Sequence, residues 1–266
     1  MIQTKNNIFR QRKINSLLTI LLIGAIYIFF TQLLSFDIID AITGSPRGFL
    51  WMRDNFFPNE TAWYPAFMFR ILETLARTAM LAISATSVAA SLAFVAGVLG
   101  SQKTGIHPIS IYLVRTVAMV FRNIPLIAWS LILIFSFRQN EFTGFLALFF
   151  GTFGFLTRSF TEIIDEADEG VLEALKATGA SYFHIVFQGV LPMVSSQVIS
   201  WLLFMIETNI RDATLVGILT GTGIGFMFNF YFGTFRYPRA GFVLLFVILS
   251  VVGLEMISNK IRRLII

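Results

Sequence analysis

Long uninterrupted runs of apolar residues dominate this sequence and restrict it to folds that lipid can surround. Residues 78–99 contain no charged side chain at all. A transmembrane helix needs about 20 mainly apolar residues to cross a hydrocarbon core about 30 Å thick. Only 13% of the 266 residues are charged, and ordinary soluble domains carry about 25%. The chain is therefore predicted to be an all-α integral membrane protein.

The apolar runs define six predicted transmembrane helices. They cover residues 16–36, 72–99, 112–137, 142–158, 191–206 and 240–257. The intervening residues 37–70 combine charges, prolines and tryptophans, which is typical of an interfacial segment on the extracytoplasmic side. We therefore divide the chain into an N-terminal span with this segment (1–70), a core domain (71–258) that contains residues 162–190, and a basic tail (259–266).

Positive charge at the two ends predicts the orientation. Lys and Arg are enriched on the cytoplasmic flanks of transmembrane helices. Four of them precede residue 16 and three follow residue 258, so both termini and residues 159–190 are expected in the cytoplasm. This requires an even number of spans, so the glycine-rich residues 213–235 are expected to be re-entrant or interfacial. Arg236 and Arg239 would then lie outside, against the charge rule.

The second span carries a stripe of small residues at four-residue spacing. The stripe consists of Ala85, Ala89, Ala93 and Gly97. Small residues at this spacing let two helices approach closely in lipid. A generic alanine-rich span would look the same, but both interpretations favour a helix in the bundle interior.

Residues 162–190 have the pattern of two helices joined by a turn. Residues 162–177 are acidic and amphipathic, and residues 181–187 are shorter and carry phenylalanines on one side. Gly179 between them can adopt a positive φ without steric cost. Pro192 then suits the first turn of the fifth span. This arrangement favours a docking surface for a soluble partner over an ordinary solvated loop.

No residues are arranged for catalysis, metal binding or nucleotide binding. The chain has no cysteine, and His107 and His184 have no metal-ligand spacing around them. No glycine is followed by lysine, as a phosphate-binding P-loop requires. We therefore expect no metal, no cofactor bound by this chain and no enzymatic activity of its own.

A polar segment after the fifth span is the candidate for a gate in a pathway. Its four candidate side chains are Glu207, Asn209, Arg211 and Asp212. Counting about 1.5 Å per residue from Leu191 places Glu207 in the outer part of the membrane. Ionisable residues at such depth usually face the bundle interior, and an arginine there would suit an oxyanion. The alternative is an interfacial turn with a structural Glu–Arg pair.

The third span carries two arginines near its start and a proline inside it. We expect Arg115 and Arg122 to anchor the cytoplasmic end of this span, with substrate contact as the alternative. Pro125 is expected to have a structural role, because proline removes a backbone hydrogen bond from a helix.

The segment "EALKATGASYFHIVFQGVLP", residues 173–192, resembles the coupling loop of binding-protein-dependent ABC transporter permeases. It matches that signature at Glu173, Ala174, Gly179, Leu191 and Pro192. It departs where Leu175 replaces an alanine and where Gly189 replaces an aliphatic residue. The stretches "ETNIRDATLVGILTGTGIG" and "VRTVAMVFRNIP" resemble the phosphonate-import permease subfamily, although methionine-type importers carry similar glycine-rich segments. The resemblance covers about residues 70–258.

The resemblance implies a multi-pass permease subunit in a bacterial inner membrane. It would move phosphonate, phosphite or phosphate inward by alternating access. Its partners would be two ATP-binding subunits that hold ATP and Mg²⁺, a second permease that is a copy or a paralogue, and an extracytoplasmic substrate-binding protein. The residues expected to contact the ATPase are Glu173, Ala174, Gly179, Ala180 and Phe183.

Three other functions stay open at this point. The permease could serve another small solute such as an amino acid, since the binding protein largely selects the ligand. An intramembrane enzyme acting on lipid phosphates would need clustered acids with histidines or metal ligands, and the acidic residues 162–173 contain no histidine. A passive channel would need a ring of pore-lining charges, which the sequence does not repeat.

Overall fold

The computed structural model describes residues 2–34, 38–57 and 63–265, and every regular element in these ranges is a helix. The chain forms two compact units, Met1–Asn55 and Phe56–Ile266. The first contains α1 (Ile2–Leu33) and most of α2 (Ile38–Phe56). Within α1, Gln11–Leu33 is long and apolar enough to cross a membrane. α2, at the beginning of the predicted interfacial segment, is an amphipathic helix.

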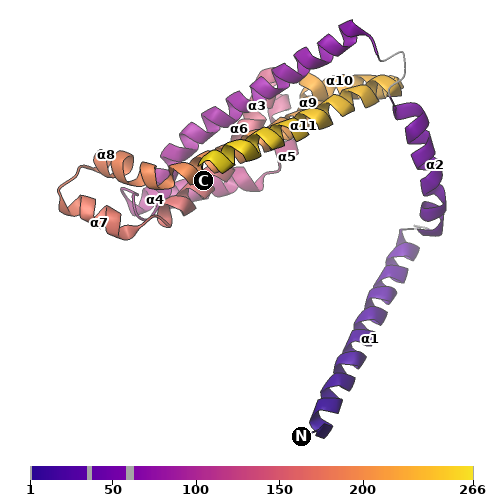
Figure 1. Cartoon of the computed structure of the whole chain (residues 1–266), viewed down its shortest axis with the longest axis horizontal. Coiled ribbons are helices and arrows are strands. Elements are labelled where there is room, and N and C mark those ends of the chain that lie inside the picture. The colour runs from indigo at the N-terminus through magenta and orange to yellow at the C-terminus, as the bar shows by residue number, and fades with distance from the viewer. Residues whose placement is uncertain (1, 35–37, 58–62, 266) are drawn as a thin grey trace. The chain divides into compact units, whose positions relative to one another are not determined.

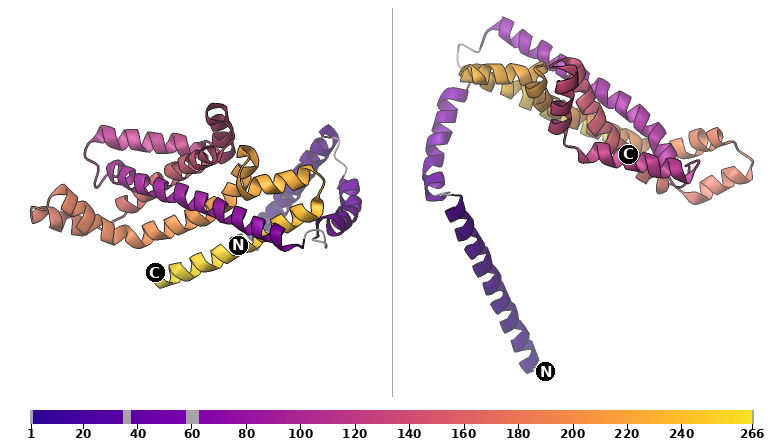
Figure 2. Two further views of the ribbon diagram at one scale, coloured as in Figure 1. Left: turned by 90° about the horizontal axis from the view of Figure 1, so that it is seen from above. Right: turned by 180° about the vertical axis from the view of Figure 1, so that it is seen from behind.

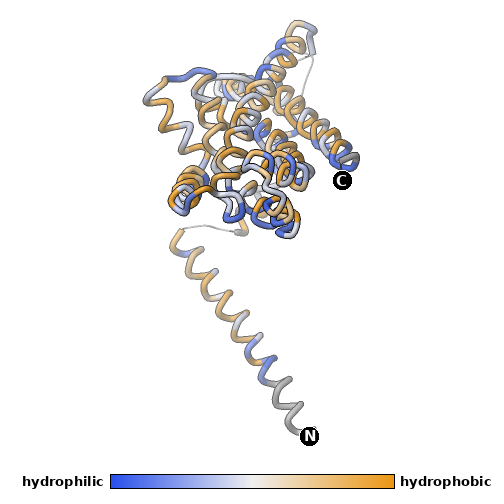
Figure 3. The backbone as a smooth tube through the Cα atoms, turned by 90° about the vertical axis from the view of Figure 1, so that its left-hand side faces the viewer, coloured by the Kyte–Doolittle hydropathy of each residue, from blue (hydrophilic) through white to orange (hydrophobic). Residues whose placement is uncertain are grey.

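The second unit is a bundle that holds the remaining helices (Figure 1). In chain order these are α3 (Pro65–Gly100), α4 (Pro108–Asn123), α5 (Leu126–Phe137), α6 (Glu141–Asp165), α7 (Glu169–Ala177), α8 (Tyr182–His184), the π-helical segment η1 (Ile185–Val190), α9 (Leu191–Thr220), α10 (Gly223–Gly233) and α11 (Tyr237–Ile265). Hydrophobic residues make up most of these helices, and hydrophilic ones gather towards their ends and connections (Figure 3).

Four helices of the described chain are long and apolar enough to cross a membrane, and a fifth span results if a bent pair is counted as one. The four are Gln11–Leu33, Pro65–Gly100, Tyr182–Thr220 and Tyr237–Arg263. The bent pair is α4 with α5, which meet at 92°. The predicted third span is therefore not one straight helix. Pro125 stands at the bend as the N-cap residue of α5, because proline has no N–H to continue the hydrogen bonds of α4.

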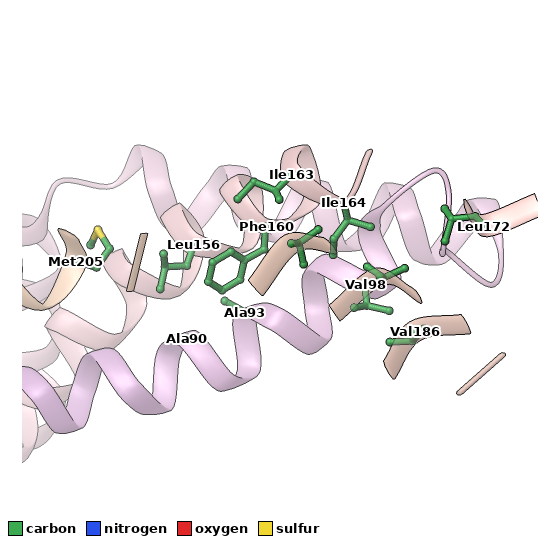
Figure 4. Packing of buried hydrophobic residues seen from close by; sticks show 12 residues of the cluster. Ala90, Ala93, Val98, Leu156, Phe160, Ile163, Ile164, Leu172, Val186 and Met205 are labelled. Carbon is green, nitrogen blue, oxygen red and sulfur yellow. The ribbon is translucent and has the colours of Figure 1, made fainter. Parts of the chain in front are cut away.

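The interior of the bundle forms where α3 packs against α6. The small-residue stripe of α3 faces this contact, and Ala85, Ala89 and Ala93 are fully buried. A Cβ at Gly97 would lie 2.9 Å from the Cβ of Phe160, so only glycine allows the two backbones to come this close. Figure 4 shows the Phe160 ring beside Ala93 in the main hydrophobic cluster.

α6 and α9 both extend further than the sequence predicts. α6 continues to Asp165, so the first acidic residues of the predicted cytoplasmic helix belong to it. α9 runs without interruption to Thr220, so the polar segment at 207–214 is helical and not a turn. The polar side chains of this segment bind partners on neighbouring helices, as described below. These side chains do not need water as a partner, so the segment can stay helical within the bundle.

The glycine-rich residues form a helical hairpin. α9 ends at Thr220 and is followed by its C-cap residue Gly221, which has φ +69°, and α10 begins at Gly223, which has φ +62°. These glycines break the helix, as the sequence predicts. A Cβ at Gly225 would collide with the carbonyl oxygen of Thr214, so α10 packs directly on the end of α9. Its 11 residues span about 16 Å, about half of a hydrocarbon core.

Candidate functional site

The segment between α6 and α9 folds into a hairpin, residues 166–190, which projects beyond the other helices of its unit (Figure 2). We call it the α7–η1 hairpin. The Asp168 carboxylate caps α7 by accepting a hydrogen bond of 2.8 Å from the Gly170 N–H. At the other end, the Gly179 N–H donates to the Lys176 carbonyl and the Ala180 N–H donates to the Leu175 carbonyl. This is a Schellman motif, and Gly179 takes its required positive φ of +78°.

The two arms of the hairpin pack on each other through a small apolar contact. Leu172 and Val186 are buried in the main cluster. Gly189 is buried as well, and a Cβ there would lie 2.6 Å from the Leu175 Cδ1. The two positions at which the sequence departs from the family signature are therefore neighbours. Leu175, which is larger than the alanine of the signature, fits here because Gly189 has no side chain.

The outer face of the α7–η1 hairpin carries most of the predicted docking residues. Glu173, Ala174 and Gly179 are exposed, and Ala180 is half-buried. Phe183 leaves 70% of its surface exposed. Aromatic residues, phenylalanine included, are enriched at protein–protein interfaces.

Asp165, at the end of α6, ties the base of the hairpin to the rest of the bundle. Its carboxylate accepts hydrogen bonds of 2.7 Å from the Ser101 hydroxyl and from the Gln102 N–H. It also pairs with the Arg115 guanidinium at 2.7 Å. The Arg115 Nε donates to the Gly100 carbonyl at 2.9 Å. The ends of α3 and α6 and the middle of α4 are thereby held together.

Two further hydrogen bonds join the connection between α3 and α4 to the hairpin itself. The Lys103 ammonium donates to the Ala167 carbonyl, and the Tyr182 hydroxyl donates to the Thr104 carbonyl at 3.0 Å. Sequence reasoning missed Ser101, Lys103 and Tyr182, because nothing in their local pattern shows that the 101–107 connection lies beside the hairpin.

The two arginines of the third predicted span have different surroundings. Arg115 has the structural contacts just described. Arg122 lines a cavity of about 210 Å³ between α4 and α6, together with Arg158 and Glu162. Arg158 and Glu162 pair with each other at 2.6 Å.

Pro192 follows η1, where the Leu191 N–H donates to the Val186 carbonyl five residues back. This wider turn accommodates the missing N–H of the proline within a continuous helix.

Asn209 is the one gate candidate that the structure buries completely within the described chain. Its amide nitrogen donates to the Thr86 hydroxyl at 2.7 Å and to the Thr152 hydroxyl at 2.6 Å. These contacts join α9 to α3 and α6 in the middle of the bundle. The threonines were not predicted, because a threonine in an apolar span usually bonds to its own helix backbone.

Glu207 is nearly buried and lies between two arginines. Its carboxylate is 3.4 Å from the Arg211 guanidinium and 3.6 Å from the Arg262 guanidinium. Arg262 belongs to the last turn of α11. Glu207 therefore lies level with the C-terminal end of α11, which differs from the outer position that counting from Leu191 predicts. Asp212 is partly buried and close enough to Arg211 for the two charges to attract.

Among the described residues, no three histidine, cysteine or acidic side chains group as metal ligands. What the structure brings together is a projecting hairpin with an exposed face, a polar junction at its base, and a buried amide that links three long helices.

The family comparison agrees with this geometry. A model of the family described as "Binding-protein-dependent transport system inner membrane component" matches residues 93–265, which is more than half of the chain. Among curated proteins, the chain is 25% identical over 187 residues to the phosphate-import permease protein PhnE of Mycolicibacterium smegmatis. That alignment covers 70% of this chain and 35% of PhnE, so the chain spans about a third of this relative's length.

Two other relatives are covered more fully. The phosphite transport system permease protein PtxC of Stutzerimonas stutzeri is 25% identical, over 77% of this chain and 74% of PtxC. The putative cryptic phosphonate transport system permease protein PhnE2 of Escherichia coli K12 is 32% identical, over 44% of this chain and 97% of PhnE2.

Solved structures show the same fold. A chain of the MetNI methionine ABC transporter in an inward-facing conformation superposes with a TM-score of 0.60 at 21% identity, over 74% of this chain and 98% of that one. An amino acid ABC transporter with histidines superposes with a TM-score of 0.57 at 14% identity, over 74% and 96%. The chain therefore belongs to the family of inner membrane components of binding-protein-dependent transport systems.

Proposed function

We propose that this chain is the membrane-spanning permease subunit of an ATP-driven importer for phosphonate or a related small oxyanion such as phosphite or phosphate. The observation that carries the proposal is the α7–η1 hairpin, whose exposed face is separate from the bundle but whose base is hydrogen-bonded to the connection between α3 and α4. The neighbouring Asp165 of α6 joins the same connection to α4. The names of the matched relatives, which refer to phosphate, phosphite and phosphonate, support the choice of substrate.

The proposed topology has six spans with both termini in the cytoplasm. The bent pair α4–α5 counts as the third span and α6 as the fourth, because its 25 residues are long enough to cross a hydrocarbon core. α9 and α11 are the fifth and sixth. α10 enters from the outer side and returns, since it is too short to cross.

Coupling follows from the contacts at the base of the hairpin. An ATP-binding subunit docks on Glu173, Ala174, Gly179, Ala180 and Phe183, and its closure on ATP moves the hairpin. Asp165 and Tyr182 transmit the displacement to the ends of α3 and α6 and to the middle of α4. Two permeases, as copies or as paralogues, then rock against each other and open the pathway alternately to the two sides. A substrate-binding protein delivers the ligand from outside.

Changing the turn of the hairpin tests this coupling. Gly179 has φ +78° and open space around a Cβ, so a substitution there strains the backbone but meets no neighbour. Asn and Asp both tolerate this backbone conformation better than other residues, and only Asp adds a charge at the docking face. We expect Gly179→Asp to abolish ATP-dependent uptake of methylphosphonate, phosphite and phosphate in cells that contain the ATPase and binding protein.

Gly179→Asn is the matched control and should retain most of the uptake. Membrane insertion of both variants is checked by their amount in the membrane fraction. Full uptake by Gly179→Asp would contradict a docking role for the hairpin. Failure of the unaltered complex to take up any of the three oxyanions would contradict the proposed substrate.

A further inference from the structure

The cavity of about 210 Å³ between α4 and the last turns of α6 lies beside the junction that anchors the α7–η1 hairpin, since Arg115 and Asp165 both line it. We call it the α4–α6 cavity. Drug-sized ligands fill cavities of about 300 Å³ or more, so this cavity has room for one small group. In the proposed topology this end of the bundle faces the cytoplasm.

The α4–α6 cavity carries one positive charge that no neighbour neutralises. Three arginines and two acidic residues line it. Arg115 pairs with Asp165 at 2.7 Å, and Arg158 pairs with Glu162 at 2.6 Å. Arg122 forms no ion pair and no side-chain hydrogen bond with any residue that the structure describes. The cavity therefore has an excess cation, located at Arg122.

A buried hydroxyl in the same cavity lacks a partner. Thr157 lines the cavity and is 1% exposed. Its hydroxyl oxygen forms no hydrogen bond with any part of the described chain. Thr161, one turn later, has such a bond, because its hydroxyl donates to the Thr157 carbonyl at 2.7 Å. Leaving a buried hydroxyl unpaired is costly, so the Thr157 hydroxyl is available to an acceptor oxygen of a ligand.

Apolar side chains are exposed before and after Arg122 in the chain. Met119 lines the cavity from α4 and is 59% exposed. Ile127 and Leu131, one turn apart on α5 beyond the bend, are also exposed. Acyl chains would cover such surface, whereas a free anion would leave it bare. Basic pockets between transmembrane helices on the cytoplasmic side suit phospholipid headgroups.

We propose that the α4–α6 cavity binds the phosphate group of an acidic phospholipid from the cytoplasmic leaflet. The Arg122 guanidinium donates two parallel hydrogen bonds to the phosphate oxygens, and the Thr157 hydroxyl donates to the same phosphate. The lipid is acidic because one net negative charge balances the excess cation of the cavity. This inference goes beyond transport and uses only the cytoplasmic position that the proposed topology gives to this end.

The test measures lipid binding to the purified, delipidated permease–ATPase complex in detergent by native mass spectrometry. The probes are phosphatidylglycerol, phosphatidylcholine and inorganic phosphate. Both lipids carry a phosphate, but only phosphatidylglycerol has a net negative charge. We expect it to bind at least about fivefold more tightly than phosphatidylcholine. Excess inorganic phosphate should not release it, because the free anion lacks the acyl chains.

Two substitutions test the two phosphate contacts. Arg122→Gln should weaken phosphatidylglycerol by about fivefold and remove its advantage over phosphatidylcholine. Thr157→Val should weaken both lipids by about threefold. Thr157→Val should also assemble normally with the ATPase, because the lost hydroxyl has no partner within the described chain. It therefore decides the question even if Arg122→Gln fails to assemble.

Lys260→Gln is the matched control, since Lys260 is exposed near the cytoplasmic end of α11 and does not line the cavity. It removes one positive charge and should leave both affinities unchanged. Unchanged binding in Arg122→Gln or Thr157→Val, or an equal loss in Lys260→Gln, would overturn the headgroup site. Release of phosphatidylglycerol by inorganic phosphate would overturn the lipid assignment. Because no transport is measured, failure of oxyanion uptake would contradict the proposed function alone.

Discussion

Asn209 shows how one side chain can link the long helices of this bundle. It is 3% exposed and donates both hydrogen bonds of its amide nitrogen, to Thr86 and to Thr152. A buried amide without partners would be costly, so these contacts hold α3, α6 and α9 in one arrangement. The sequence singled out Asn209 for its polarity in an apolar region. It did not reveal the partners, because they are 123 and 57 residues away.

Removing this amide should destabilise the bundle measurably. We expect Asn209→Ala to lower the free energy of unfolding by about 1–2 kcal/mol, since both threonine hydroxyls lose a partner and a small cavity forms. Unfolding of the purified chain in mixed detergent micelles, followed by circular dichroism, measures the change.

Asn259→Ala serves as the control, because Asn259 is exposed on α11 and should change the stability by less than about 0.5 kcal/mol. Equal stabilities of Asn209→Ala and the unaltered chain would show that the three-helix link carries no net energy.

The α7–η1 hairpin illustrates what sequence can and cannot predict about an element. The turn at Gly179 follows from local chemistry, since glycine alone adopts a positive φ freely, and the structure places it there. The apolar cores of the spans follow in the same way from hydropathy. Pro125 marks the position of the bend between α4 and α5, but the 92° angle of the bend and the length of α9 do not follow from local sequence, because they depend on packing against distant residues.

The contact between Leu175 and Gly189 predicts a compensating pair of substitutions. Gly189→Val should destabilise the hairpin by about 1–3 kcal/mol, because the new side chain overlaps the Leu175 methyl group. The double variant Leu175→Ala with Gly189→Val should recover at least half of that loss. Hydrogen exchange of the hairpin amides, measured by mass spectrometry for the single and double variants, gives the coupling energy. Additive effects of the two substitutions would show that the side chains do not share this space.

The second unit as a whole has two chemically different ends. One end bears the projecting hairpin and the polar junction at Asp165. The other end bears a cavity lined by two arginines and two glutamates, Arg70, Arg77, Glu73 and Glu141. α3 and α6 run between the two ends.

The central claim is that the partner ATPase docks on the exposed face of the α7–η1 hairpin. The chain contains no cysteine, so a single introduced thiol reports one position without background. The two variants to compare are Phe183→Cys, on the hairpin, and Thr234→Cys, directly after α10 at the opposite end of the bundle. Each variant is labelled with a photoactivatable thiol reagent in membranes that contain the ATPase. We expect ATPase cross-links from position 183, altered by ATP, and none from position 234. Cross-links absent at 183 in a complex that still hydrolyses ATP would contradict this claim.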